Sequence, residues 1–162
     1  MKKIIKLYEN NYMKFTISKV NWFLLFKIPS AYFAGVRTKS ITDHGVEVYV
    51  KHRWINQNPF GSMYWAVQGM ASELTTGLIV MRAIHKKKIP ISMLVTNQTG
   101  TFTKKAKGRI IFTCTDIKIV EDKISSLSIE NPTTTFKLTS IGIDSDGDQV
   151  SNFEYEWSLK LK

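Results

Sequence analysis

The chain has little of what would place it in several protein classes. Its single cysteine, Cys114, excludes an internal disulfide framework and a cysteine-based metal site. Cys114 lies in an apolar run that begins at Arg109, so we interpret it as a packed side chain. The histidines also lack ligand spacing, and no metal site is predicted. These features favour a reducing compartment, and we expect the protein in the cytosol.

Long hydrophobic runs are missing as well. The most apolar early stretch, residues 20–26, is interrupted by Lys27 and Pro29 and is too short to span a bilayer. Residues 1–6 have the charge of a signal peptide without its apolar centre. We therefore expect no membrane insertion. The length predicts one domain over residues 1–162, with an N-terminal helical extension over about residues 10–28.

Acidic residues are too few to balance the basic ones, and the formal net charge is +10. Such an excess attracts nucleic acid, a membrane surface or a phosphate-rich ligand. The basic clusters at residues 86–88 and 104–107 lack the interleaved aromatic side chains of a base-stacking surface. No helix-turn-helix or zinc-finger spacing is present either. We interpret the charge as a solvated basic face and expect no nucleic-acid partner.

The N-terminal half is predicted to contain two helices and a hairpin. Strands over residues 35–41 and 46–50 flank a turn at 43–45. A long helix from Met63 to about Ile84 follows a loop at residues 56–62, in which Ser62 is the expected helix cap. The first helix, over residues 11–27, is expected to dock through Tyr12, Phe15, the stem of Lys19, Trp22, Phe23 and Phe26.

Two stripes run along the predicted long helix. Small residues on one stripe let the helix lie close against a sheet or a partner, and Glu73 lies among them. The small-residue stripe contains Ala66, Gly69 and Gly77. The apolar stripe that should face the core contains Met63, Val67, Met70, Leu74, Leu78 and Met81.

The remainder is predicted to be mostly β-structure. Alternation indicates strands near residues 91–95, 110–114, 133–143 and 153–161, with a short helix over 117–127. The acidic turn at residues 144–148 differs from a calcium loop, because Gly147 is its fourth position and strands flank it. We interpret it as a hairpin turn. The element order predicts an α+β fold in which an antiparallel sheet wraps around the long helix.

Three segments resemble a bacterial branch of the hotdog superfamily, a domain of unknown function related to acyl-coenzyme A thioesterases. They are NPFGSMY at 58–64, ASELTTG at 71–77 and residues 147–158, and the resemblance covers about residues 22–160. It implies a hotdog fold of about six strands and a homodimer, with pairing into a tetramer left open. It further implies acyl-coenzyme A or acyl carrier protein as a partner at the dimer interface, and no cofactor beyond the coenzyme A of that substrate.

The resemblance also implies a catalytic site. Related thioesterases have a catalytic Asp or Glu at the position of Glu73, and their His-Gly-Gly string falls on Tyr64, Trp65 and Ala66. The backbone N–H of Trp65 can still polarise a carbonyl, whereas its side chain takes up room that glycine leaves free. Tyr64 either donates a hydrogen bond in place of the histidine or packs at the dimer interface.

The other candidates have two interpretations each. Glu73 is a base or nucleophile, or a charge at the helix edge that reaches water. Asn58 orients the substrate or water, or holds its loop, and the neighbouring Gly61 and Ser62 are expected to bind the substrate. Two functions follow: hydrolysis of acyl thioesters, or binding of an acyl or lipid-like ligand without turnover. Four basic residues are expected either to contact coenzyme A phosphates or to be simply solvated. They are Lys104, Lys105, Lys107 and Arg109.

Overall fold

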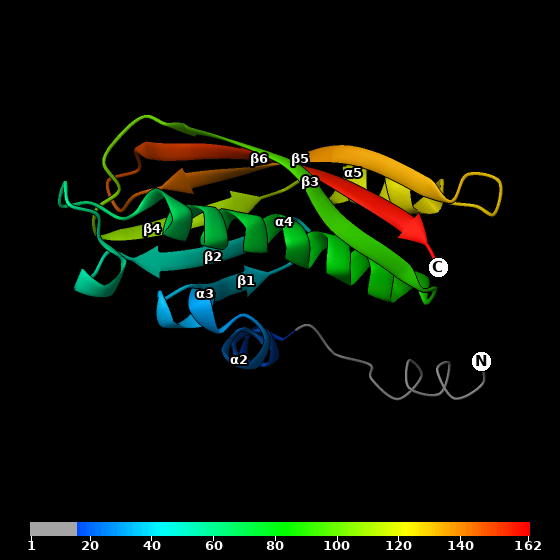
Figure 1. Ribbon diagram of the computed structural model, residues 1–162, viewed down its shortest axis with the longest axis horizontal. Coiled ribbons are helices and arrows are strands. Elements are labelled where there is room, and N and C mark those ends of the chain that lie inside the picture. The colour runs from blue at the N-terminus through cyan, green and yellow to red at the C-terminus, as the bar shows by residue number, and fades with distance from the viewer. Residues whose placement is uncertain (1–15) are drawn as a thin grey trace.

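A computed structural model describes residues 16–162, in which one curved antiparallel sheet lies against a long helix, α4 (Figure 1). The predicted α+β class and element order are confirmed. The strands are β1 (Arg37–Ile41), β2 (Val46–Lys51), β3 (Ile91–Phe102), β4 (Arg109–Cys114), β5 (Thr133–Ile143) and β6 (Gln149–Leu161). The helices are α2 (Ile17–Lys27), α3 (Pro29–Phe33), α4 (Trp65–Lys87) and α5 (Ile117–Ser125), with a 3-10 turn, η1 (Trp54–Asn56).

The strand order in the sheet is β1-β2-β4-β5-β6-β3. β6 lies between β5 and β3 and pairs with both along most of its length. At one edge, α2 packs against β1. At the opposite edge, β3 is exposed over residues 96–102. No helix within residues 16–162 is long and apolar enough to cross a membrane.

The core lies between α4 and the inner face of the sheet. α4 packs mainly on β2, β4, β5 and β6. The predicted apolar stripe is buried at Val67, Leu74 and Leu78, whereas Met70 and Met81 are only half-buried. The predicted alternation of β6 is also confirmed, although the last inward side chain, Leu161, is only half-buried. Four of the core-facing side chains are buried. They are Phe153, Tyr155, Trp157 and Leu159.

Polar side chains also join α4 to β6. Gln68 Oε1 accepts a hydrogen bond from Ser151 Oγ at 2.9 Å. The Ser72 and Tyr155 hydroxyls lie 2.6 Å apart, and Trp157 Nε1 donates to Thr76 Oγ1 at 3.1 Å. The helical members are spaced by four residues, which places them on one face of α4. Because a buried polar group without a partner is destabilising, these three pairs fix how α4 lies along β6.

The predicted docking face of the first helix is wrong. The side chains of α2 that contact the core are Val20 and Leu24, whereas Trp22 is 61% exposed and Phe26 71% exposed. Asn21 explains this orientation, because its Oδ1 accepts the Thr38 backbone N–H of the β1 edge at 3.0 Å. Since α2 is apolar on both sides, its periodicity could not show which side would be buried. Tyr12 and Phe15 lie outside the described residues.

Candidate functional site

The loop before α4 is organised by Asn58. Its Oδ1 accepts the backbone N–H groups of Phe60 and Ser62 at 3.0 and 3.2 Å. Ser62 is buried and its hydroxyl also bonds to Asn58, so the prediction that Ser62 caps the helix is wrong. The cap position belongs to Tyr64, whose side chain makes no capping bond. Gly61 adopts a positive φ of 70°, which allows the tight turn between Asn58 and Ser62.

The first turn of α4 offers free backbone donors. Val67 and Gln68 direct their N–H groups to the Tyr64 carbonyl at 3.0 and 3.4 Å. Within residues 16–162, the N–H groups of Trp65 and Ala66 have no hydrogen-bond acceptor. Such donors, together with the helix dipole, favour an oxygen that carries or develops negative charge.

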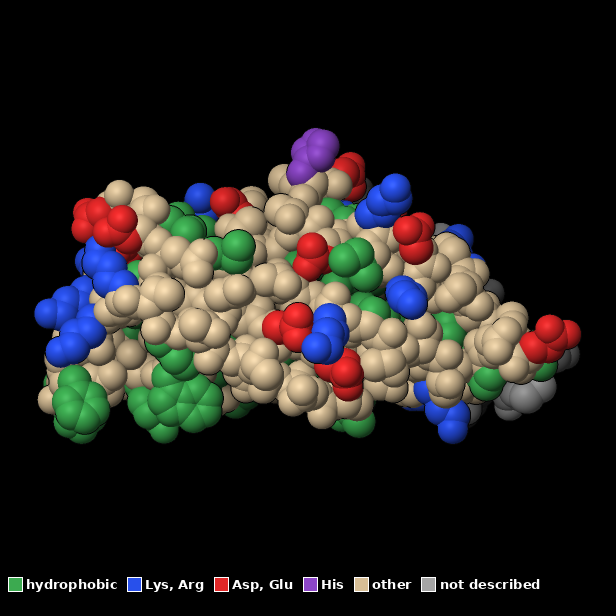
Figure 2. Space-filling view, turned by 90° about the horizontal axis from the view of Figure 1, so that it is seen from above, with side chains coloured by type: hydrophobic (Ala, Val, Ile, Leu, Met, Phe, Trp, Pro, Cys, Tyr) green, Lys and Arg blue, Asp and Glu red, His purple; other side chains and the backbone are tan. Residues whose placement is uncertain are grey.

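An open depression of about 390 Å³ lies at this end of α4. Bulky hydrophobic side chains and a group of Lys and Arg side chains gather at the same end of the molecule (Figure 2). The depression brings five of the predicted site residues together, while Gly61, Tyr64, Glu73, Lys107 and Arg109 do not line it. The five are Asn58, Ser62, Trp65, Lys104 and Lys105.

Glu73 lies two turns deeper on α4. Eight residues separate it from Trp65, which corresponds to roughly 12 Å along the helix axis. Burial raises the pKa of its carboxyl above the ordinary 4.5. Gly77 provides the space, since a Cβ at Gly77 would lie 3.3 Å from Glu73 Oε1 and 3.5 Å from the Trp157 ring. Among the described residues, no side chain or backbone group forms a hydrogen bond or ion pair with this carboxylate.

The inner face of the sheet is uncovered on this side of α4. Strand register directs Gln98, Gly100 and Phe102 of β3 to the same face as the buried β6 residues, yet all three are exposed. Gly69, on the same stripe of α4 as Glu73, lies next to Phe153 and Tyr155 of β6. The uncovered strip of β3 therefore runs beside the small-residue stripe that contains Glu73.

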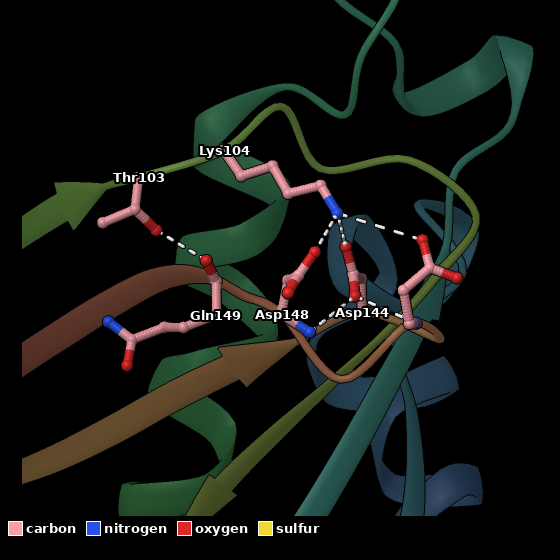
Figure 3. A network of polar contacts seen from close by, with 6 residues as sticks. Thr103, Lys104, Asp144, Asp148 and Gln149 are labelled. Carbon is pink, nitrogen blue, oxygen red and sulfur yellow. Dashed lines mark hydrogen bonds and ion pairs between the residues drawn. The ribbon is translucent and has the colours of Figure 1, made fainter.

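Lys104 is engaged by the acidic turn between β5 and β6 (Figure 3). Its Nζ lies 2.7 Å from an Asp144 oxygen and 2.6 Å from an Asp148 oxygen. These hydrogen bonds raise the pKa of Lys104, and the same contact lowers the pKa of Asp144 below 3.8. We therefore assign Lys104 to holding the loop between β3 and β4. Lys105 donates to the Phe60 carbonyl at 3.5 Å.

Lys104→Gln is expected to lower the Tm slightly at pH 7. The pKa of Asp144 is lowered in the folded state, so the Lys104–Asp144 contact stabilises the fold above pH 3.8. This stabilisation is lost as the pH falls through the folded-state pKa of Asp144. The Tm difference between wild type and Lys104→Gln should therefore shrink below pH 3.8. Thermal melts from pH 2 to 7 measure this, with exposed Lys107→Gln as the control. An equal Tm difference at every pH would contradict the assignment.

Some residues of the site were missed by sequence reasoning. Tyr155 and Trp157 were assigned only to an alternating strand, although they lie beside the Glu73 stripe. Burial raises the pKa of Tyr155 well above its ordinary value, so its hydroxyl stays protonated. The signal available in the sequence was the polar spacing of Gln68, Ser72 and Thr76 within an otherwise apolar helix.

A curved antiparallel sheet around one long helix defines a hotdog fold, and solved structures share it. A protein of unknown function from Pseudomonas aeruginosa, described as a probable thioesterase, has a TM-score of 0.73 and 18% identity, over 90% of this chain and 96% of its own. A second protein of unknown function, from Chlorobaculum tepidum, has a TM-score of 0.76 and 13% identity, over 90% of this chain and 94% of its own.

A thioesterase from Staphylococcus aureus has a TM-score of 0.59 and 13% identity, over 77% of this chain and 93% of its own. One structure of this protein has alanine in place of the glutamine at its position 32. Another has alanine in place of the glutamate at its position 47. The chain belongs to the family described as domain of unknown function DUF4442, whose model matches residues 18–159. No curated protein matches it significantly.

Proposed function

We propose that this protein hydrolyses acyl thioesters at an interface between two copies of the chain, with Glu73 as base or nucleophile. The observation that carries the proposal is the Glu73 carboxylate, which is half-buried, unpaired among the described residues and adjacent to an uncovered strip of the sheet. A raised pKa brings a carboxylate closer to the working range of a general base. The hotdog relatives named as thioesterases support the same chemistry.

The spacing of two side chains adds support. The glutamine and glutamate replaced in the Staphylococcus aureus thioesterase are fifteen residues apart, as Asn58 and Glu73 are here. Asn58 lines the depression at the start of α4, although its oxygen is occupied by the loop. We infer that its amide nitrogen is the group available to a substrate, by exchanging its bond to Ser62.

The reaction needs two features that lie apart in one chain. A thioester carbonyl would accept hydrogen bonds from the N–H groups of Trp65 and Ala66. Glu73 would take a proton from water as the water oxygen bonds to the carbonyl carbon, and collapse of the tetrahedral intermediate would break the carbon–sulfur bond. The thiolate then takes up the proton. Since roughly 12 Å separates the two features along α4, the two that act together come from different copies.

The free edge of β3 is the expected contact between the copies. The N–H of Gln98 bonds to the Asn97 side chain at 2.9 Å, so it does not take part in the β3–β6 pairing. Gln98→Pro removes this outward donor and leaves the pairing with β6 intact. We expect wild type at twice 18.6 kDa and Gln98→Pro at 18.6 kDa in light scattering. A Gln98→Pro dimer would place the interface elsewhere, and Gln98→Ala is the control.

The second candidate is binding of an acyl or lipid-like ligand without turnover. The side chain of Trp65, half-exposed at the first position of α4, supports it, because it occupies space next to the free N–H groups. A panel of acyl-coenzyme A thioesters of increasing chain length distinguishes the two functions. Release of free thiol supports hydrolysis. Calorimetric binding without thiol release at any chain length favours the second candidate, with Lys105 and Lys107 as groups for the coenzyme A phosphates.

A further inference from the structure

The outward face of α2 combines aromatic and basic side chains. Lys19, Trp22 and Phe26 are spaced by three and four residues, so they lie on one side of the helix. The two rings stack with centroids 5.8 Å apart and an interplanar angle of 11°. Both are more than half exposed, and neither contacts the core. We call Lys19, Trp22 and Phe26 the α2 outer face.

The charge around this face has one sign. Residues 10–42 contain five Lys and Arg and no Asp or Glu. Within the described part of the chain, Lys19 and Lys27 make no ion pair with a carboxylate. Phe33 of α3, which follows directly, is also exposed. An exposed aromatic face flanked by unpaired lysines has the chemistry of a helix that lies in a membrane interface.

We propose that the α2 outer face docks on the surface of an anionic lipid bilayer. The Trp22 and Phe26 rings would enter the headgroup region, and Lys19 and Lys27 would lie near lipid phosphates. A second copy of this face fits less well, because it would oppose lysines with lysines and has no carboxylate to offer. α2 lies on the β1 edge of the sheet, opposite β3, so docking leaves β3 and the strip beside Glu73 free (Figure 1).

Vesicle co-sedimentation of the full chain tests this proposal without any acyl thioester, so its outcome is separate from that of the proposed hydrolysis. The probes are vesicles of phosphatidylcholine alone and of phosphatidylcholine mixed with phosphatidylglycerol. We expect binding to the mixed vesicles to exceed binding to the neutral ones by at least about tenfold, and to weaken as salt is added. Equal binding to both vesicle types, or none to either, overturns the proposal.

Variants locate the contact. Trp22→Ser combined with Phe26→Ser is expected to reduce partitioning onto the mixed vesicles by more than about tenfold. Lys19→Gln and Lys27→Gln should each reduce it by about fivefold. The matched control is Trp54→Ser, since Trp54 is 83% exposed on η1 and distant in sequence. Unchanged binding of the Trp22 and Phe26 double variant overturns the proposal.

Light scattering distinguishes docking on lipid from covering of the α2 outer face by a second copy of the chain. All these positions are exposed, so the variants should keep the wild-type Tm, which a thermal melt checks. The molar mass should also stay at the wild-type value in the Trp22 and Phe26 double variant. A mass that halves in that variant would show that a second copy covers the α2 outer face, and it would overturn docking on lipid.

Discussion

Replacing Glu73 with glutamine is expected to lower kcat for acyl thioester hydrolysis by about 10²–10⁴-fold. Glutamine keeps the size of the side chain but cannot accept a proton from water or attack the carbonyl. In wild type, burial raises the pKa of Glu73, so activity should rise with pH on an acid limb that lies above pH 4.5. Initial rates of thiol release from pH 4 to 9 measure both effects.

The same variant should be more stable than wild type at neutral pH. The folded state raises the pKa of Glu73, so it binds the proton more tightly than the unfolded chain does. Wild-type stability therefore falls as pH rises from 4.5 through the folded pKa, and this loss should be absent in Glu73→Gln. Glu130→Gln, at an exposed position, is the control. Full turnover in Glu73→Gln would remove Glu73 from the mechanism.

Trp157→Ala is expected to reduce the free energy of unfolding by about 3–5 kcal/mol. The indole is buried beside Gly77, which Glu73 also approaches, and its N–H is satisfied by Thr76. Its removal leaves a cavity in the core and opens the wall beside the carboxylate to water. Urea unfolding measures the loss, and Glu73 should then titrate closer to its ordinary pKa, which moves the acid limb of activity to lower pH.

One further substitution separates packing from hydrogen bonding at Trp157, and a second serves as a control. Trp157→Phe keeps an aromatic ring and removes the donor to Thr76, so a loss well below that of Trp157→Ala is expected. Leu94→Ala, at an exposed position of β3, should stay within about 0.5 kcal/mol of wild type. A Trp157→Ala protein as stable as Leu94→Ala would contradict the role given to this side chain.

Much of the fold could be predicted because its elements have clear periodicity. The alternation at residues 153–161 predicted a strand whose inward side chains are buried as far as Leu159, and the stripe from Val67 to Leu78 predicted the central helix. Boundaries were less accurate at α4, which begins at Trp65 rather than Met63. The loop was the reason, since Asn58 binds Ser62 and leaves Tyr64 as the cap.

What could not be predicted depends on contacts between distant residues. Lys104 was expected to be a candidate phosphate ligand, but Asp144 and Asp148, some forty positions later, surround its ammonium group. The exposure of Trp22 follows from the bond between Asn21 and the β1 edge, which no local pattern encodes. The pairing of Ser72 with Tyr155 likewise joins residues 83 positions apart.

The place of β3 in the sheet affects how the chain folds. Its strand partner is β6, and Ile91 is paired with Leu161, so β3 is synthesised long before the strand that holds it. During that interval, twelve residues rich in β-forming side chains have unsatisfied peptide groups along both edges. Such long-range pairing slows folding and favours association of incomplete chains. The interval before β6 is complete is thus the stage at which β3 is most open to such association.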